Sequence, residues 1–308
     1  MIKIIESFAG DTVQVIELRE KINDALANNN LVKVKLWQPG IMYEEDNNWL
    51  TVIDFINEWE GKPVIFYSNL VPLRELQCEF HYTNDMFISG HELYKQNALC
   101  RNLLGALNPL SNDRRYHWDF LFGQHKPLKD ELYPKLLAHT VAPKVFHTYF
   151  KNNPVDGIWS HGRVPKNHSA ETIDGNEDAF DNPVRHSDLI DVEIYNQTYY
   201  SAVIETVIHN DFAMFSEKEA KPIVAGRPFV ILGAQHQLRA FRSLGFQTFS
   251  DVIDESYDEI EDCHERFDAV LDSMQKLTGE DPVKVYNTLK PVLEHNRKHF
   301  LEHNWTKV

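Results

Sequence analysis

The secondary-structure pattern is clearest in the stretch SEKEAKPIVAGRPFVIL, residues 216–232. Ser216 is a favourable N-cap, and the charged residues after it fall in the first turn of a helix. Helical spacing then runs over residues 217–225, and the apolar run 228–232 has the composition of a short buried strand. The stretch therefore predicts a helix followed closely by a strand, which is the repeating unit of α/β proteins.

The same alternation extends outward in both directions. In the first half, strand-like runs at 2–5, 32–37, 63–67 and 86–89 alternate with helical patterns at 13–27, 49–60 and 93–107. In the second half, strands are expected at 118–123, 144–149 and 199–209, and helices at 128–139, 264–277 and 282–304. The polar stretch 156–183 has little periodicity, so we interpret it as a long surface insertion. The fold class that we expect is α/β with parallel sheets.

The chain is long enough for two domains, since 308 residues exceed what one hydrophobic core usually organises. A turn-rich segment at 108–115 separates the halves and has the composition of an interdomain linker. We therefore expect a first domain over residues 1–113, a second over 114–280 and a terminal helix over 281–308.

Composition excludes several classes of protein. No apolar run approaches the length of a membrane span, and the first residues lack the apolar stretch of a signal peptide, which predicts a cytoplasmic protein without a membrane span. The three cysteines are scattered and show no metal-binding spacing, so disulfides and zinc knuckles are not expected. The net charge of −15 argues against non-specific adhesion to nucleic acid or anionic lipid.

The start of the helix at Ser216 is the strongest candidate for a binding site. Exposed N–H groups and the helix dipole at this end favour an anion such as a diphosphate. The Glu217 carboxylate can accept hydrogen bonds from ribose or sugar hydroxyls, while the Lys218 ammonium neutralises phosphate. The alternative, which local physics alone favours, is a well-capped and charged helix start with no ligand.

The surrounding sequence resembles GT-B glycosyltransferases related to the fucosyltransferases and to transferases encoded by tailed phages. In their donor-binding signature a Ser/Thr-Glu-Lys triplet precedes a helix, a turn of small residues and a Pro-Phe strand, as residues 216–229 do here. Upstream, AVIET at 202–206 is similar to the family's strand ending in Glu-Thr. Downstream, LGFQTF at 244–249 and DESYD at 254–258 resemble further family segments. The similarity covers residues 120 to about 277.

The resemblance implies a particular architecture and a donor. Two Rossmann-like, doubly wound domains would face each other across a cleft, with the C-terminal helix packing back toward the first, acceptor-side domain. The donor would be a nucleoside diphosphate sugar, with UDP-sugar favoured over GDP-sugar, and neither a cofactor nor a metal would be needed. The loop after the strand at 118–123 carries cations where the family has Arg or His, although lysine is less selective in geometry than arginine. The donor-binding residues implied are Ser216, Glu217, Lys218, Lys221, Glu205, Gly123, His125, Lys126 and Lys129.

The first half offers no comparable motif, so acceptor-side candidates come from position alone. Ligands of open α/β sheets bind at the carboxyl ends of strands, which favours Asp11 and Glu6 as catalytic general bases and His91 as an acceptor contact. The insertion adds three candidate acceptor contacts: Trp159, His161 and Arg163. Each of these is more often an ordinary loop or capping residue.

His295, His299 and His303 share one helix face, where a solvated polar surface is favoured over a metal site.

Several functions remain open at this stage. One acceptor is 5-hydroxymethylcytosine in phage DNA, which would place the protein in the host cytoplasm, although the acidic charge weighs against duplex binding. A glycan, lipopolysaccharide or protein acceptor is the alternative. A non-catalytic nucleotide-sugar-binding protein and a structural virion protein are the other classes. The sequence leaves the oligomeric state undecided.

Overall fold

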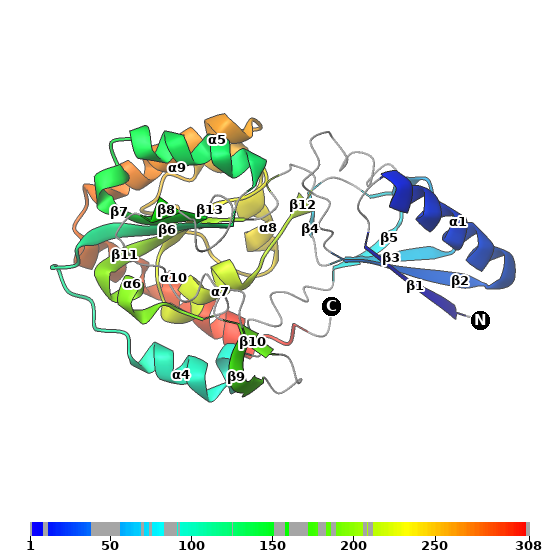
Figure 1. The fold of residues 1–308 in the computed structure, drawn as a ribbon, viewed down its shortest axis with the longest axis horizontal. Coiled ribbons are helices and arrows are strands. Elements are labelled where there is room, and N and C mark those ends of the chain that lie inside the picture. The colour runs from blue at the N-terminus through cyan, green and yellow to red at the C-terminus, as the bar shows by residue number, and fades with distance from the viewer. Residues whose placement is uncertain are drawn as a thin grey trace.

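Two mainly parallel β-sheets, each with its own hydrophobic core, organise the chain (Figure 1). This confirms the expected α/β class. The computed structural model describes residues 2–8, 12–37, 56–68, 71–73, 76–82, 91, 93–124, 126–150, 158–159, 172–177, 183–185, 189–205, 208 and 212–305.

The smaller sheet belongs to the first 82 residues and has the order β1-β2-β3-β5, parallel throughout. Its strands are β1 (Ile2–Phe8), β2 (Leu31–Trp37), β3 (Val64–Ser68) and β5 (Glu79–Tyr82), and α1 (Thr12–Asn28) connects the first two. Leu18 and Ile22 of α1 pack on Val32, Val34 and Phe66 of the sheet. The described strands follow chain order in one direction, so the doubly wound order expected for this half is not seen among them.

The larger sheet has the order β13-β11-β6-β7-β8, and only the β7–β8 pair within it is antiparallel. From β6 the chain moves outward to β7, and it later returns to β11 on the opposite side of β6. The order therefore reverses between β6 and β11, which creates a topological switch point at their carboxyl ends. The strands are β6 (Tyr116–Gln124), β7 (Val145–Phe150), β8 (Ile158–Trp159), β11 (Thr198–Ile204) and β13 (Phe229–Leu232).

Helices cover both faces of this sheet (Figure 1). One face carries α5 (Pro127–Ala138) and α9 (Cys263–Thr278), and the other carries α6 (Val192–Gln197), α7 (Glu217–Ala225) and α10 (Pro282–Glu302). Every residue of β11 is buried, because a central parallel strand has helices on both sides. The predicted helix at 217–225 is confirmed, and it ends where Gly226 takes the left-handed conformation with φ of 63°.

The remaining elements are short. They are α4 (Ala98–Gly105), α8 (Gln237–Ser243), the 3₁₀ turns η1 (Ala142–Lys144) and η4 (Ser256–Glu259), and the strands β4 (Val71–Pro72), β9 (Thr172–Glu177), β10 (Pro183–Arg185) and β12 (Phe212–Ala213). β9 pairs with β10, and β4 of the first half pairs with β12 of the second, both antiparallel. Part of the expected insertion at 156–183 therefore contributes to strands β8 and β9.

Residues on both sides of the boundary expected at 113 share one hydrophobic core. Leu93, Tyr94 and Cys100 are buried in the core of the larger sheet, so the segment around α4 belongs to that unit. The turn-rich segment is also held within it, since Arg114 donates to the Tyr195 and Thr198 carbonyls at 2.9 and 2.7 Å. Turn composition marks a loop, but it does not show which core the flanking helix joins.

The terminal helix is expected to pack toward the domain over residues 1–113, and its end accepts a hydrogen bond from His91 of that range at the Leu301 carbonyl. Val285, Leu289 and Phe300 of α10 are buried in the larger core. The His299 side chain donates from Nε2 to the Leu244 carbonyl at 2.7 Å, and His295 donates in the same way to Gly245 at 3.0 Å. Because these two side chains bind backbone carbonyls, the helix face of His295, His299 and His303 has a packing role. A solvated surface was expected there.

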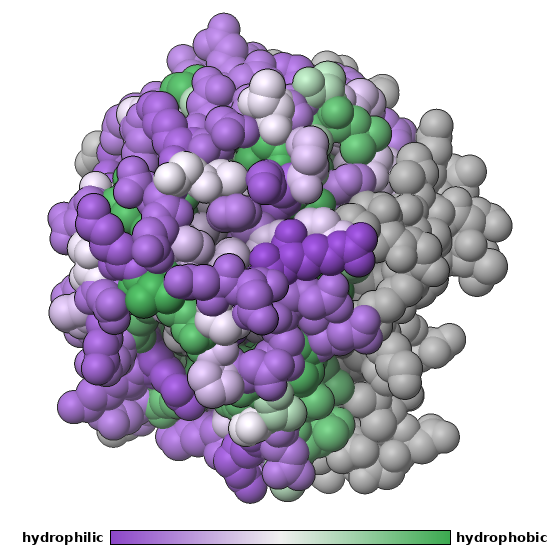
Figure 2. All heavy atoms as spheres, turned by 90° about the vertical axis from the view of Figure 1, so that its left-hand side faces the viewer, coloured by the Kyte–Doolittle hydropathy of each residue, from purple (hydrophilic) through white to green (hydrophobic). Residues whose placement is uncertain are grey.

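The outer face at the amino ends of the larger sheet is mostly hydrophilic, with small apolar areas between (Figure 2). Among the described large apolar side chains, Ile4 and Leu137 are exposed. None of the described helices is long and apolar enough to cross a membrane.

Candidate functional site

Charged side chains gather at the switch point of the larger sheet. Two of its elements, the β6–α5 connection and the end of β11, meet the first turn of α7 there. We call the set the switch-point cluster; it consists of Lys126, Lys129, Glu205, Ser216, Glu217, Lys218 and Glu219. Six of these seven residues are donor-site candidates from the sequence, and Glu219 is the addition.

The first turn of α7 is built by a reciprocal cap. The Ser216 hydroxyl accepts a hydrogen bond from the Lys218 amide at 3.3 Å, and the Glu219 carboxylate accepts one from the Ser216 amide at 2.9 Å. Both Ser216 and Glu219 are fully buried. The cap fixes the direction in which the first turn presents the side chains of Glu217 and Lys218.

Glu205 joins the end of β11 to this turn. Its Oε1 accepts from the Ser216 hydroxyl at 2.7 Å, and its Oε2 lies 3.2 Å from Lys218 Nζ. Lys218 Nζ also lies 3.6 Å from Glu217 Oε1. Burial lowers the pKa of Lys218, but the carboxylates of Glu205, Glu217 and Glu219 outweigh burial and raise it above its ordinary value. Lys218 is therefore a fixed positive charge at neutral pH.

Lys129 supplies a second cation of a different kind. Its side chain is buried, and Nζ donates to the Phe122 carbonyl near the end of β6. The pKa of Lys129 is lowered to about 7, chiefly by burial and also by the charges of Lys218 and Lys126, while Glu205 and Glu217 oppose the shift. Lys129 consequently changes charge near neutral pH, and an anion bound nearby would favour its charged form.

The hydrogen bond from Lys129 to the Phe122 carbonyl lies where the pairing of β6 becomes irregular. Pairing with β7 shifts register between Leu121 and Gln124, and Gly123 has φ of 67°. Any side chain is strained at this φ, so glycine is the natural residue for the bend. Among the described residues no atom would meet a Cβ at Gly123 within 4 Å. The bend directs the chain from β6 toward Lys126 and α5.

Arg266, in α9, ties neighbouring loops together at the same edge of the sheet. Its Nε donates to Gly233 O after β13 at 3.2 Å, and Nη2 donates to Ile208 O beyond β11 at 3.3 Å. Its Nη1 donates to Ile260 O and Glu261 O. Sequence reasoning missed this role, although an arginine beside the apolar face of a predicted helix was a usable signal.

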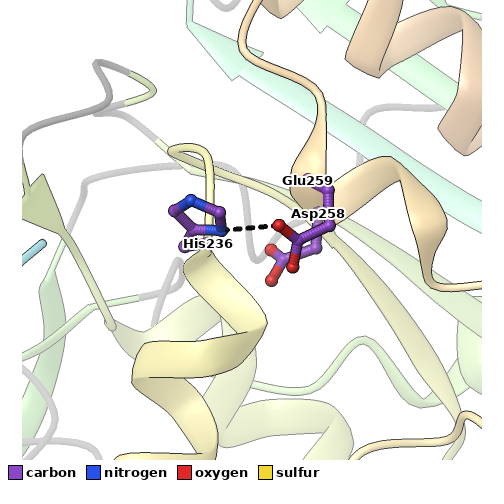
Figure 3. Close-up of side chains that lie close together, drawn as sticks. All are labelled: His236, Asp258 and Glu259. Atoms are coloured by element: carbon purple, nitrogen blue, oxygen red, sulfur yellow. Dashed lines mark ion pairs between the residues drawn. The ribbon is translucent and has the colours of Figure 1, made fainter.

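His236, Asp258 and Glu259 form a compact group near the start of α8 (Figure 3). His236 Nδ1 lies 3.3 Å from Glu259 Oε2. The two Asp258 oxygens accept from the Leu238 amide at 2.9 Å and the Arg239 amide at 3.3 Å, so this carboxylate caps the helix. These three residues could supply ligands for a divalent cation, but the geometry of Asp258 is accounted for by capping.

Other candidates lie away from the cluster or outside the described residues. Lys221 lies one turn along α7, and its charge opposes the rise that burial causes in the pKa of Asp119 in β6. His91 is buried and donates from Nε2 to the Leu301 carbonyl of α10 at 3.1 Å, so it packs between elements of the larger unit and is not placed as an acceptor contact.

Only the backbone of Glu6 in β1 and of Trp159 in β8 is described. The candidates Asp11, His125, His161 and Arg163 lie outside the described residues.

Comparison of the chain with protein-family models, with curated proteins and with solved structures gives no match. The chemistry of the switch-point cluster is therefore the basis for a functional assignment.

Proposed function

We propose that the protein binds the diphosphate of a nucleotide sugar at the switch-point cluster and transfers the sugar to a hydroxyl acceptor. The observation that carries this proposal is the meeting of Lys126, Lys129 and Lys218 with the capped start of α7 at the point where the strand order reverses. Ligands of open α/β sheets bind at this position, and helix starts favour anions there.

The charges of the cluster suit an activated sugar better than a bare phosphate. Lysine ammonium groups can neutralise the diphosphate, whereas Glu217, whose side chain is about one quarter exposed, can accept hydrogen bonds from ribose or sugar hydroxyls. Glu205 is buried and already accepts from Ser216 and Lys218, so its part is to position Lys218. The cluster thus combines phosphate-neutralising and hydroxyl-binding groups within one helical turn.

In the proposed transfer, the bond between the anomeric carbon and the diphosphate oxygen breaks, and its electron pair stays on the diphosphate. The acceptor oxygen bonds to the anomeric carbon and loses its proton to a base or to solvent. Lys218 and Lys129 would stabilise the charge that develops on the departing diphosphate. Asp11 and Glu6 remain predictions for the base, and UDP remains the predicted nucleotide.

A thermal-shift series tests the proposal. UDP-sugars or GDP-sugars are expected to raise the melting temperature of the wild type, because a ligand that binds only the folded state stabilises it by mass action. The rise should be largely lost in Lys126→Met and Glu217→Gln. It should persist in Lys298→Met, which removes an exposed lysine of α10 that is paired with Glu302 at 3.9 Å. Absence of any shift in the wild type, together with absence of sugar transfer, would contradict the proposal.

The acceptor stays a prediction, with hydroxymethylated DNA on one side and a glycan, lipopolysaccharide or protein on the other. Acceptor binding measured over a salt series separates them. A duplex predicts a steep loss of affinity as salt rises, and a neutral glycan predicts almost none. The net charge of −15 favours the shallow dependence. Tight nucleotide binding without turnover on any acceptor would instead indicate a binding protein.

A further inference from the structure

Two carboxyl groups meet behind the first turn of α7. Glu219 is fully buried, and its Oε2 accepts from the Ser216 amide at 2.9 Å. No hydrogen-bond donor among the described residues reaches its buried Oε1. Glu205 lies beside this side chain, since both carboxyl groups bind Ser216, whose hydroxyl donates to Glu205 Oε1 at 2.7 Å and whose amide donates to Glu219 Oε2.

Two neighbouring buried carboxyl groups favour a proton on one of them. Both Glu205 oxygens already accept, one from the Ser216 hydroxyl at 2.7 Å and one from Lys218 Nζ at 3.2 Å. Two ionised carboxylates in contact repel each other, and a buried carboxylate oxygen without a donor is costly. A protonated Glu219 removes both problems, since its O–H can donate to Glu205.

We propose that Glu219 is protonated in the folded protein at neutral pH and donates from Oε1 to Glu205, so that the two carboxyl groups share one negative charge. Burial and the charge of Glu205 raise the pKa of Glu219 well above the ordinary value of 4.5, and Lys218 and the Ser216 amide oppose the rise only in part. Among the described residues, the charged groups near the pair also include Glu217 in α7 and Lys129 in α5.

The shared proton sets the charge of the switch-point cluster. With Glu219 neutral and Lys129 charged, three lysines face two carboxylates, and the cluster carries a net positive charge suited to an anion. Ionisation of Glu219 would cancel that charge. The proton also stabilises the capping box, since both Glu219 oxygens then have partners.

Glu219→Gln tests the proposal because glutamine copies the protonated acid. Its carbonyl can accept from the Ser216 amide, and its NH₂ can donate to Glu205. Denaturant unfolding of both proteins is measured from pH 4.5 to pH 8. A folded-state pKa above the unfolded value stabilises the folded protein fully below about pH 4.5, and this stabilisation is lost as pH rises toward the folded-state pKa. Relative to Glu219→Gln, the unfolding equilibrium constant of the wild type should therefore rise tenfold per pH unit from about pH 4.5 until the pH reaches the folded-state pKa.

The matched control is Glu217→Gln, which removes one formal charge from the same helical turn. The ratio of the wild-type to the Glu217→Gln unfolding equilibrium constant should show no comparable rise with pH. A ratio of the wild-type to the Glu219→Gln unfolding equilibrium constant that stays constant or falls as pH rises would show that Glu219 is ionised, and would overturn the proposal.

A second measurement needs no variant. The ¹³C chemical shift of the Glu219 side-chain carboxyl, assigned by through-bond correlation in the wild type, should be that of a protonated acid at pH 7. The shift of a carboxylate would overturn the proposal even if Glu219→Gln failed to fold. Neither measurement uses a ligand, so both results are independent of whether a nucleotide sugar binds.

Discussion

Replacing Asp119 with alanine is expected to lower the free energy of unfolding by about 3–5 kcal/mol, because it leaves the Arg227 guanidinium buried without its counter-charge. Arg227 Nη2 lies 2.9 Å from Asp119 Oδ2, and both side chains are about 5% exposed. Asp119 also accepts from the Thr198 and Ser201 hydroxyls at 3.0 and 3.1 Å. Chemical denaturation of the purified variant measures the loss.

The matched control is the Arg19–Glu58 pair, which has the same 2.9 Å separation but more than 40% exposure of each side chain. Glu58→Ala should cost less than about 1 kcal/mol, since exposed ion pairs contribute little. Similar losses in the two variants would contradict the importance assigned to burial. Asp119 lies in the amino-terminal half of β6, away from the switch point, so the folded fraction of Asp119→Ala should still bind nucleotide sugar.

The affinity for a UDP-sugar is expected to fall about tenfold between pH 6 and pH 8 if binding requires charged Lys129. The pKa of Lys129 is lowered to about 7 by burial, so the ammonium is mostly charged at pH 6 and mostly neutral at pH 8. A diphosphate diester has no group that titrates in this range, which assigns the change to the protein. Isothermal titration calorimetry gives the dissociation constant at each pH.

Lys129→Met provides the comparison for this prediction. The variant should bind more weakly at pH 6 and should lack the tenfold decline toward pH 8. An equally steep decline in Lys129→Met would assign the titration to another group. Calorimetry in buffers of different ionisation enthalpy should also show proton uptake on binding near pH 7 in the wild type only.

The sequence anticipated those parts of the fold and candidate site that depend on short segments. Ser216 as an N-cap and the helix at 217–225 follow from local patterns, the position of Glu205 at the end of a strand was implied by the family resemblance, and each is confirmed. The cluster itself could be anticipated because the carboxyl ends of parallel strands lie along one edge.

What the sequence could not give depends on contacts between distant segments. Glu219 looked like an ordinary helix residue, since nothing in its neighbours shows that Glu205 lies beside it. Apolar runs predict that strands exist but not their order, which is why the one-directional order of the smaller sheet was not foreseen. For the same reason, composition does not show that Cys100 and Trp118, on either side of the boundary expected at 113, share a core.

A crystal structure with a bound UDP-sugar tests the central proposal most directly. The proposal predicts the diphosphate within hydrogen-bonding distance of Lys218 Nζ, at the start of α7, with Lys126 and Lys129 beside it. A nucleotide bound elsewhere on the chain, with the switch-point cluster unchanged and without a ligand, would contradict it.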